Sequence, residues 1–159
     1  MTLSPSSPLV YLATALAYMI GVDKDNAVEE RAKFLAIFHK HVRRQELTAD
    51  SLKVLTESAF ARAKANPLGD FLHEANLTLT HAQKTAILLN LFDVMVADGR
   101  MTAGESALFD EAMNIFGLKK ESFQAVREML ILKNDTTVFT NPLHPCNEST
   151  YQFGVRIDR

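Results

Sequence analysis

The stretch VMVADGRMTAGESALFDEAM, from Val94 to Met113, decides how this chain is expected to fold. It begins in an apolar run, passes through a short acidic turn and continues with apolar residues at helical spacing. Gly99 is expected to end the first helix, because glycine takes a left-handed backbone conformation at little cost. A second helix is expected to begin near Thr102, with Glu105 in its first turn. The stretch therefore predicts two helices joined by a tight acidic corner.

Apolar residues recur at helical spacing along most of the chain. Helices are expected at Pro8–Gly21, Ala27–Arg44, Asp50–Ala65, Leu68–Ala75, Thr80–Ala97, Thr102–Phe116 and Lys119–Lys133. The length of 159 residues and the hydrophobic content of 47% are typical of one globular domain with a substantial core. We therefore predict an all-α, single-domain bundle of six to seven helices.

An internal repeat becomes visible when the chain is shifted by 75 residues. Residues 16–34 then lie over residues 91–109, so that Asp23 falls on Asp98 and Glu30 falls on Glu105. Each copy has an apolar helix, an acidic turn, and a helix with a carboxylate in its first turn. The repeat predicts two similar helical halves that pack as one body, each covering an apolar face of the other.

The chain changes character at its C-terminal end. Residues 1–133 are assigned to the helical domain, and residues 134–159 to an extension with two prolines and no helical stripe. Apolar residues alternate in this extension as in a strand, at Tyr151, Phe153, Val155 and Ile157. Together with the stretch TVF they predict a hairpin over the helical body; an irregular tail is the alternative.

Charge and cysteine content narrow the classes of function. The net charge of −2 and the pI of about 6.2 leave no broad basic field for a nucleic-acid backbone. Cys146 is the single cysteine, which excludes an internal disulfide and fits a reducing compartment. The apolar run LVYLATALAYMIGV is too short to span a bilayer and has no preceding lysine or arginine, so neither an inserted helix nor a signal peptide is expected. These features predict a cytoplasmic protein.

Two groups of polar residues lie outside the acidic turns. Asp93 interrupts an apolar helix, so its carboxylate is expected to pair with a lysine or arginine. Asp70, His73 and Glu74 lie within one helical turn. They are interpreted as a solvated helix face rather than as an acid–base cluster.

The motif VADGRMTAGE, between an apolar helix and an amphipathic one, resembles the signature of the TerB-like family. This family includes tellurite-resistance proteins and the N-terminal regions of some membrane-anchored J-domain co-chaperones. Its pattern is an Ala-Asp-Gly turn, a serine or threonine and then a glutamate, often in two copies. The second copy in this chain matches at Ala97, Asp98, Gly99, Thr102 and Glu105.

The first copy departs from the family pattern. It has Val22-Asp23-Lys24 in place of the Ala-Asp-Gly turn, and Ala27 in place of the hydroxyl residue. The resemblance covers roughly residues 8–133. It implies an all-α fold, acidic turns that bind a divalent metal, and a setting in tellurite or envelope stress.

The candidate metal ligands are Asp23, Asp25 and Glu30 in the first turn and Asp98 and Glu105 in the second. Carboxylate oxygens are the ligands that Ca²⁺ and Mg²⁺ prefer. The spacing is not that of an EF-hand, because the twelfth position from either leading aspartate is a phenylalanine. A cation site would therefore need oxygens from both turns, from water or from the backbone.

Helix capping is the competing interpretation of the same residues. Thr102 and Glu105 form a capping box, in which each side chain bonds the other residue's backbone amide. In the first copy Ala27 cannot cap, and with Asn26 as the cap the third helical residue would be Glu29. Glu30 nevertheless aligns with Glu105, which favours a role shared by the two carboxylates. Both interpretations stay open at this level.

The leading hypothesis is a non-enzymatic accessory module of the stress response that binds Ca²⁺ or Mg²⁺ and docks onto other proteins. Membrane-associated stress complexes and a second copy of the chain are the candidate partners; nucleic acid and direct membrane insertion are not expected. The first alternative is a structural protein–protein interaction domain without metal. The second is a metal-dependent hydrolase, which would need an open metal position beside a base.

Overall fold

The computed structural model describes residue 4, residues 6–22 and residues 28–152. Within these ranges the chain forms α-helices and one short 3-10 helix, and it contains no strand. The helices are α1 (Pro8–Val22), α2 (Val28–Arg43), α3 (Ala49–Ala65), α4 (Leu68–Thr78), α5 (His81–Met95), α6 (Ala103–Phe116), α7 (Lys120–Asn134) and α8 (Thr137–Thr140), followed by the 3-10 helix at Pro145–Asn147. The all-α prediction is confirmed, and α1 to α7 correspond to the predicted helices.

Several helix ends follow from the local capping chemistry. Thr80 caps the start of α5 and Thr102 caps the start of α6, each with a complete capping box, and the box at Thr102 is the one predicted from the sequence. Gly117 ends α6 with a φ of 69°, and Gly99 takes a φ of 77° in the turn after α5. These are left-handed conformations that a side chain would strain, which is why glycine stands at both positions.

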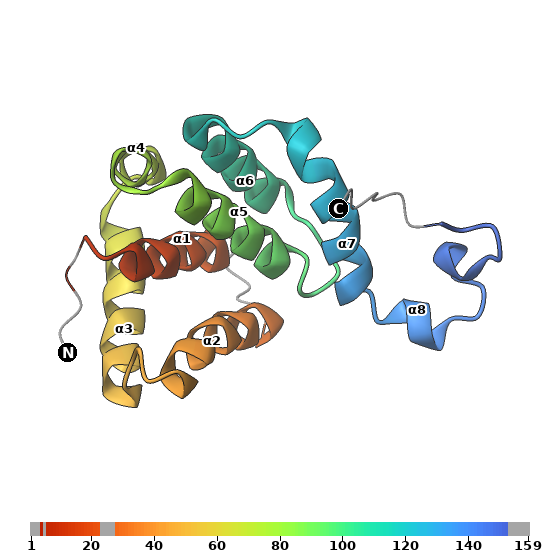
Figure 1. Cartoon of the computed structure of the whole chain (residues 1–159), viewed down its shortest axis with the longest axis horizontal. Helices are drawn as coiled ribbons and strands as arrows, with labels where there is room; N and C mark the ends of the chain where they lie inside the picture. Colours follow the sequence, from red (N-terminus) through yellow and green to blue (C-terminus); the bar gives the residue numbers. More distant parts are fainter. Residues whose placement is uncertain (1–3, 5, 23–27, 153–159) are drawn as a thin grey trace.

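The helices α1 and α5 lie side by side in the middle of the bundle, and the others cover them (Figure 1). The first of these, α1, carries no charged residue and packs on both α3 and α5. Leu16 of α1 and Leu88 and Leu91 of α5 are completely buried. No helix in the described part of the chain is both long and apolar enough to cross a membrane.

Two similar sets of helices build this core. The first repeat unit consists of α1, α2 and α3, and the second of α5, α6 and α7; α4 connects them and packs on α6. In each unit the second and third helices meet through phenylalanine rings. The ring centroids of Phe34 and Phe60 are 5.7 Å apart, and those of Phe109 and Phe123 are 5.3 Å apart. The halves predicted from the repeat therefore share an aromatic contact as well as a sequence pattern.

The C-terminal extension differs from the predicted hairpin. Residues 137–140, which include the TVF stretch, form α8, a single helical turn, and Tyr151 lies in no regular element. Asp135 accounts for the difference, because its Oδ1 accepts bonds from both the amide and the hydroxyl of Thr137. Such local bonds stabilise a helical turn against an extended strand. The remaining residues of the predicted strand, Phe153, Val155 and Ile157, lie outside the described residues.

Two large apolar residues of the helices are partly exposed. Leu35 of α2 is 45% exposed and Met129 of α7 is 44% exposed. The buried side of α2 consists of Glu30, Phe34 and Phe38, which follow one another at intervals of four. A carboxylate thus occupies the first position of an otherwise apolar stripe.

Candidate functional site

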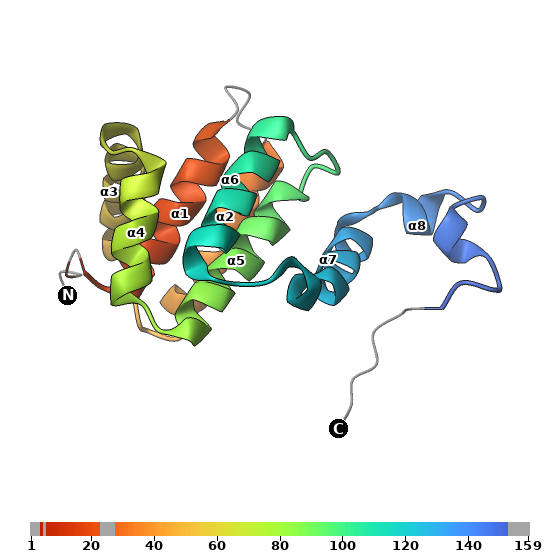
Figure 2. The same cartoon turned by 90° about the horizontal axis from the view of Figure 1, so that it is seen from above.

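The chain on either side of the first acidic turn lies at the same end of the bundle as the second turn. Figure 2 shows the end of α1 and the start of α2 beside the loop of residues 96–102 that joins α5 to α6. Asp23 and Asp25, two of the candidate ligands, lie outside the described residues. The arrangement follows from the repeat, because α1 with α5 and α2 with α6 occupy corresponding places.

A cavity of about 540 Å³, here called the acidic cavity, lies at this end of the bundle. Glu29 of α2 lines it on one side, and Asp98 and Gly99 line it from the α5–α6 loop. Asp135 and Thr137, which follow α7, complete its wall. Residues of both repeat units therefore face one space. Glu29 and Asp135 could not be assigned to this cavity from the sequence, because their approach to the second turn depends on tertiary packing.

Glu30 and Glu105 are buried, with exposed fractions of 6% and 2%. They are the only charged side chains buried in the described part of the chain. The two positions are related by the repeat, and each is the third residue of its helix. Burying a carboxylate costs free energy unless hydrogen bonds or a cation compensate its charge. Because Glu30 and Glu105 occupy equivalent positions, we look for one explanation that applies to both.

Helix capping accounts for part of this burial. Oε2 of Glu105 accepts a bond from the amide of Thr102 at 2.8 Å, and the Thr102 hydroxyl accepts one from the amide of Glu105 at 3.2 Å. In α2, Glu30 is the third residue from the helix start at Val28. Asn26 and Ala27, the residues considered as the cap of this helix, lie outside the described residues, so the capping argument for the first turn stays a prediction.

Asp98 is exposed and organises its own turn. Its Oδ1 accepts a bond from the amide of Arg100 at 2.8 Å, across Gly99. This is the usual way in which an aspartate closes a tight turn. Asp98 therefore lines the acidic cavity, whereas Glu105 is buried and is not part of its lining.

Asp93 lies at a junction of three helices. Its carboxylate accepts bonds from Lys33 of α2 at 3.0 Å and from Lys133 and Asn134 of α7 at 3.1 and 2.9 Å. Burial acts to raise the pKa of Asp93, but the bonds from Asn134, Lys33 and Lys133 outweigh it and lower this pKa. The expected pairing with lysine is confirmed. The three helices come from both repeat units, so this ion pair joins the two.

Glu74 belongs to a structural cluster rather than to a solvated face. Its Oε1 accepts a bond from the Tyr11 hydroxyl at 2.6 Å, and both carboxylate oxygens accept bonds from Arg62 at 2.7 and 2.8 Å. The guanidinium of Arg62 also lies 5.2 Å from the ring centroid of Tyr11 and 5.5 Å from that of Phe71. The bonds from Tyr11 and Arg62 lower the pKa of Glu74, so it is ionised and paired.

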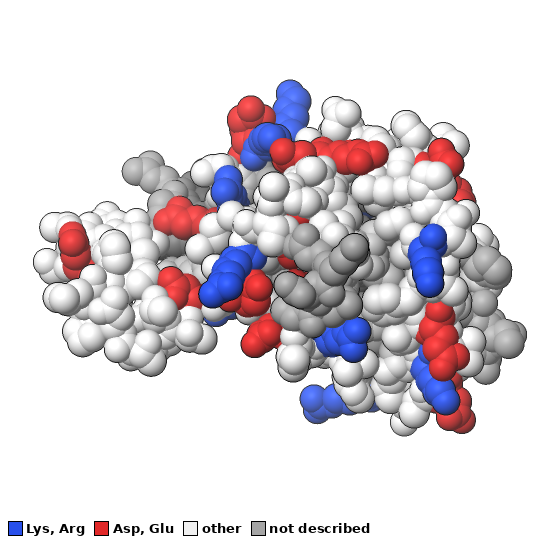
Figure 3. All heavy atoms as spheres, turned by 180° about the vertical axis from the view of Figure 1, so that it is seen from behind, with Lys and Arg blue, Asp and Glu red and all other residues white. Residues whose placement is uncertain are grey.

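The described residues contain no group of three or more His, Cys, Asp or Glu side chains placed to hold one metal ion. Glu30, Asp98 and Glu105 therefore do not form a complete set of ligands by themselves. On the face shown in Figure 3, acidic and basic side chains are interspersed. That face thus presents a mixed surface charge rather than a field of one sign.

A family model described as "Tellurite resistance protein TerB" matches residues 10–128, about three quarters of the chain. The match begins in α1 and ends in α7, so it includes both repeat units and both acidic turns. Neither the curated proteins nor the solved structures gave a match.

Proposed function

The chain belongs to the TerB family, and from this premise we propose that it is a non-catalytic tellurite-resistance module that binds a divalent cation between its two acidic turns. The cation would be Ca²⁺ or Mg²⁺, and it would neutralise the carboxylates that gather at this end of the bundle. The TerB family is not known as an enzyme family, and the proposed role requires no reaction.

One observation carries the proposal: the two repeat-related glutamates, Glu30 and Glu105, are the charged residues buried in the described part of the chain. A capping box holds one oxygen of Glu105, and Glu30 is buried at the repeat-related position of α2. A cation shared between the turns would compensate the charge of both. Glu29 and Asp98, which line the acidic cavity together, would extend its negative field.

The chemical type of the candidate ligands suits a hard cation, because each of them offers carboxylate oxygens. Glu30, Asp98 and Glu105 would contribute from the described residues, and Asp23 and Asp25 would supply further oxygens from the first turn. One oxygen of Asp98 and one of Glu105 already accept backbone bonds, which fixes the orientation of each carboxylate. Backbone carbonyls and water would complete the coordination.

The direct test is titration calorimetry with Ca²⁺, Mg²⁺ and Zn²⁺, combined with thermal unfolding. We expect Ca²⁺ or Mg²⁺ at a hundredfold excess over its dissociation constant to raise the melting temperature by roughly 5–10 °C. An absence of both heat and thermal shift with all three metals would reject the proposal.

The decisive variant is Glu105→Gln. Glutamine can still accept the Thr102 amide bond, so the capping box is retained while the charge is removed. We expect Glu105→Gln and Glu30→Gln to abolish the thermal shift with cation, and Glu57→Gln, an exposed change on α3, to preserve it. A thermal shift that persists in both buried-site variants would show that the cation binds elsewhere.

A second candidate function, docking onto another protein, is favoured by the C-terminal extension. Phe139 is 91% exposed and Leu143 is 89% exposed. Residues 136–152 carry one charged side chain, Glu148, and Figure 3 shows this lobe projecting from the molecule almost without colour. An exposed apolar surface of this kind marks an interaction site. A second copy of the chain is the partner that can be tested directly.

A further inference from the structure

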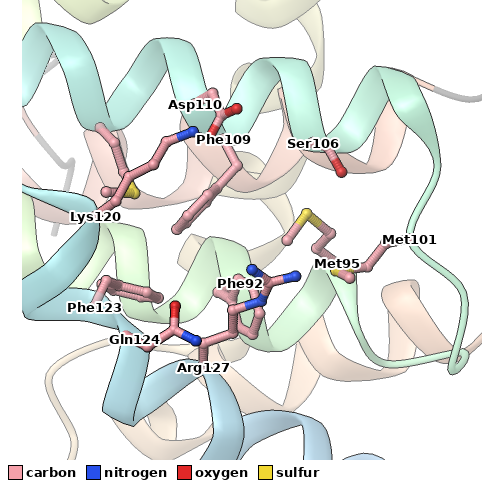
Figure 4. Close-up of a pocket in the computed structure, with 11 residues that line it drawn as sticks. Phe92, Met95, Met101, Ser106, Phe109, Asp110, Lys120, Phe123, Gln124 and Arg127 are labelled. Carbon is pink, nitrogen blue, oxygen red and sulfur yellow. Dashed lines mark ion pairs between the residues drawn. The ribbon is translucent and has the colours of Figure 1, made fainter.

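A second cavity, of about 230 Å³, lies between α5, α6 and α7 (Figure 4). Its interior is formed by five buried apolar side chains: Phe92, Met95, Phe109, Met113 and Phe123. Methionine side chains adapt to ligands of different shape, and aromatic rings offer large apolar contact areas. We call it the phenylalanine pocket; it is distinct from the acidic cavity, although Met101 lines both.

The rim of the phenylalanine pocket carries an unmatched positive charge. Lys120 pairs with Asp110 at 3.1 Å, so these two charges compensate each other. Arg127 has no ion pair with any residue in the described ranges. Figure 4 shows its guanidinium turned toward the pocket, in front of Phe92. An anionic group at the mouth would therefore meet an available partner.

The first repeat unit contains a related hollow of about 310 Å³, lined by Ile20, Arg31, Phe34, Leu35 and Phe60. The 75-residue shift places four of these residues on Met95, Ser106, Phe109 and Asp110 of the phenylalanine pocket. Arg31 likewise forms no ion pair within the described ranges. Each unit therefore combines a phenylalanine-lined hollow with one arginine that forms no ion pair with the described residues, although the two arginines stand on different helices.

We propose that the phenylalanine pocket binds a small monocarboxylic acid with an apolar tail, whose carboxylate bonds to Arg127. An engineered apolar cavity of about 150 Å³ admits a benzene ring. A pocket of about 230 Å³ therefore has room for one ring with a short arm, or for a short hydrocarbon chain. A carboxylate forms charge-assisted, often bidentate bonds with a guanidinium. This binding goes beyond the proposed cation site and does not depend on it.

The test compares octanoate with octanol, which has the same tail without the charge. In protein with methyl-labelled methionines, we expect octanoate to shift the methyl signals of Met95 and Met113. The signal of Met129, which does not line the pocket, should stay in place. Octanol should bind at least tenfold more weakly, because it cannot form the ionic bond.

Two variants localise the interaction. Arg127→Gln should weaken octanoate binding about tenfold and leave octanol unaffected, whereas Arg43→Gln, an exposed change at the end of α2, should affect neither. Ser106→Phe should block the pocket and abolish the binding of both probes. Equal affinity for the two probes, with no effect of Arg127→Gln, would overturn the proposal and favour an apolar side chain of a partner protein as the occupant. Unchanged Met95 and Met113 signals at saturating octanoate would overturn it as well.

Discussion

Asp93 shows how a single residue can hold the two repeat units together. It stands on α5 and bonds to Lys33 on α2 and Lys133 on α7, so one carboxylate joins three helices from both units. Hydrogen bonds to charged groups contribute more than neutral ones, and Asp93 is largely shielded from solvent. The lowered pKa of Asp93 means that the folded protein favours its ionised form.

Asp93→Asn should lower the free energy of unfolding by about 1–3 kcal/mol at neutral pH. Because folding lowers the pKa of Asp93, its contribution is complete above the unfolded-state pKa, about 3.9. It is lost as the pH falls through the lower folded-state pKa. Urea denaturation at a series of pH values should therefore show the wild type and Asp93→Asn converging in acid.

Asp70→Asn is the control for this experiment. Asp70 is exposed, and its side chain forms no hydrogen bond with the described residues. Its substitution should leave the unfolding free energy within about 0.5 kcal/mol of the wild type. A difference between wild type and Asp93→Asn that stays constant down to pH 2 would contradict the assigned role of ionised Asp93.

Among the helices, those with strong periodicity and a capping signal could be predicted from the sequence. The start of α5 followed from Thr80 and Gln83, and the end of α6 from Gly117. The four-residue helix α8 could not be predicted, because one turn is too short for a periodic pattern and its first two residues, Thr137 and Val138, are β-branched. The hydrogen bond between the side chains of Asp135 and His144, which lie nine residues apart, could not be predicted from the sequence either.

Asp135→Ala should loosen the C-terminal extension without unfolding the bundle. Asp135 joins Thr137 to His144, whose Nε2 lies 2.9 Å from its Oδ2. The bonds from Thr137, followed by that from His144, lower the pKa of Asp135. Hydrogen–deuterium exchange should become faster between residues 137 and 147, while the exchange of α1 and α5 amides stays unchanged.

Glu148→Ala serves as the matched change within the same extension. Only the backbone of Glu148 forms bonds with the described residues. Its substitution should leave the exchange rates of the extension as they are. Equally fast exchange in both variants would show that Asp135 does not hold the extension.

At the scale of the whole molecule, the repeat predicted which residues correspond but not what surrounds them. Glu30 and Glu105 were identified as equivalent from the sequence, and both prove to be buried. Lys33, Glu29 and Asp135 could not be placed, because their contacts join segments that lie more than 25 residues apart in the chain. The phenylalanine pocket could not be predicted either, because the apolar residues that line it have the sequence pattern of ordinary core residues.

The exposed extension leads to a prediction about assembly. If Phe139 and Leu143 form a docking surface for a second copy, the wild type should self-associate as its concentration rises in sedimentation velocity experiments. The double variant Phe139→Ser, Leu143→Ser should stay monomeric. Leu77→Ser, at an equally exposed leucine of α4, should behave as the wild type. Self-association that survives in the double variant would place the contact elsewhere.

The uncharged helix α1 has a consequence for synthesis on the ribosome. The ribosome completes α1 before its neighbour α5, which ends at Met95, 73 residues after Val22. At about 5–20 residues per second, the apolar side of α1 that packs on α5 stays uncovered in the nascent chain for roughly 4 to 15 s, although α3 is completed earlier. A chaperone that binds uncharged helices would bind α1 in this interval. Slower translation would lengthen the time during which the nascent chain can aggregate.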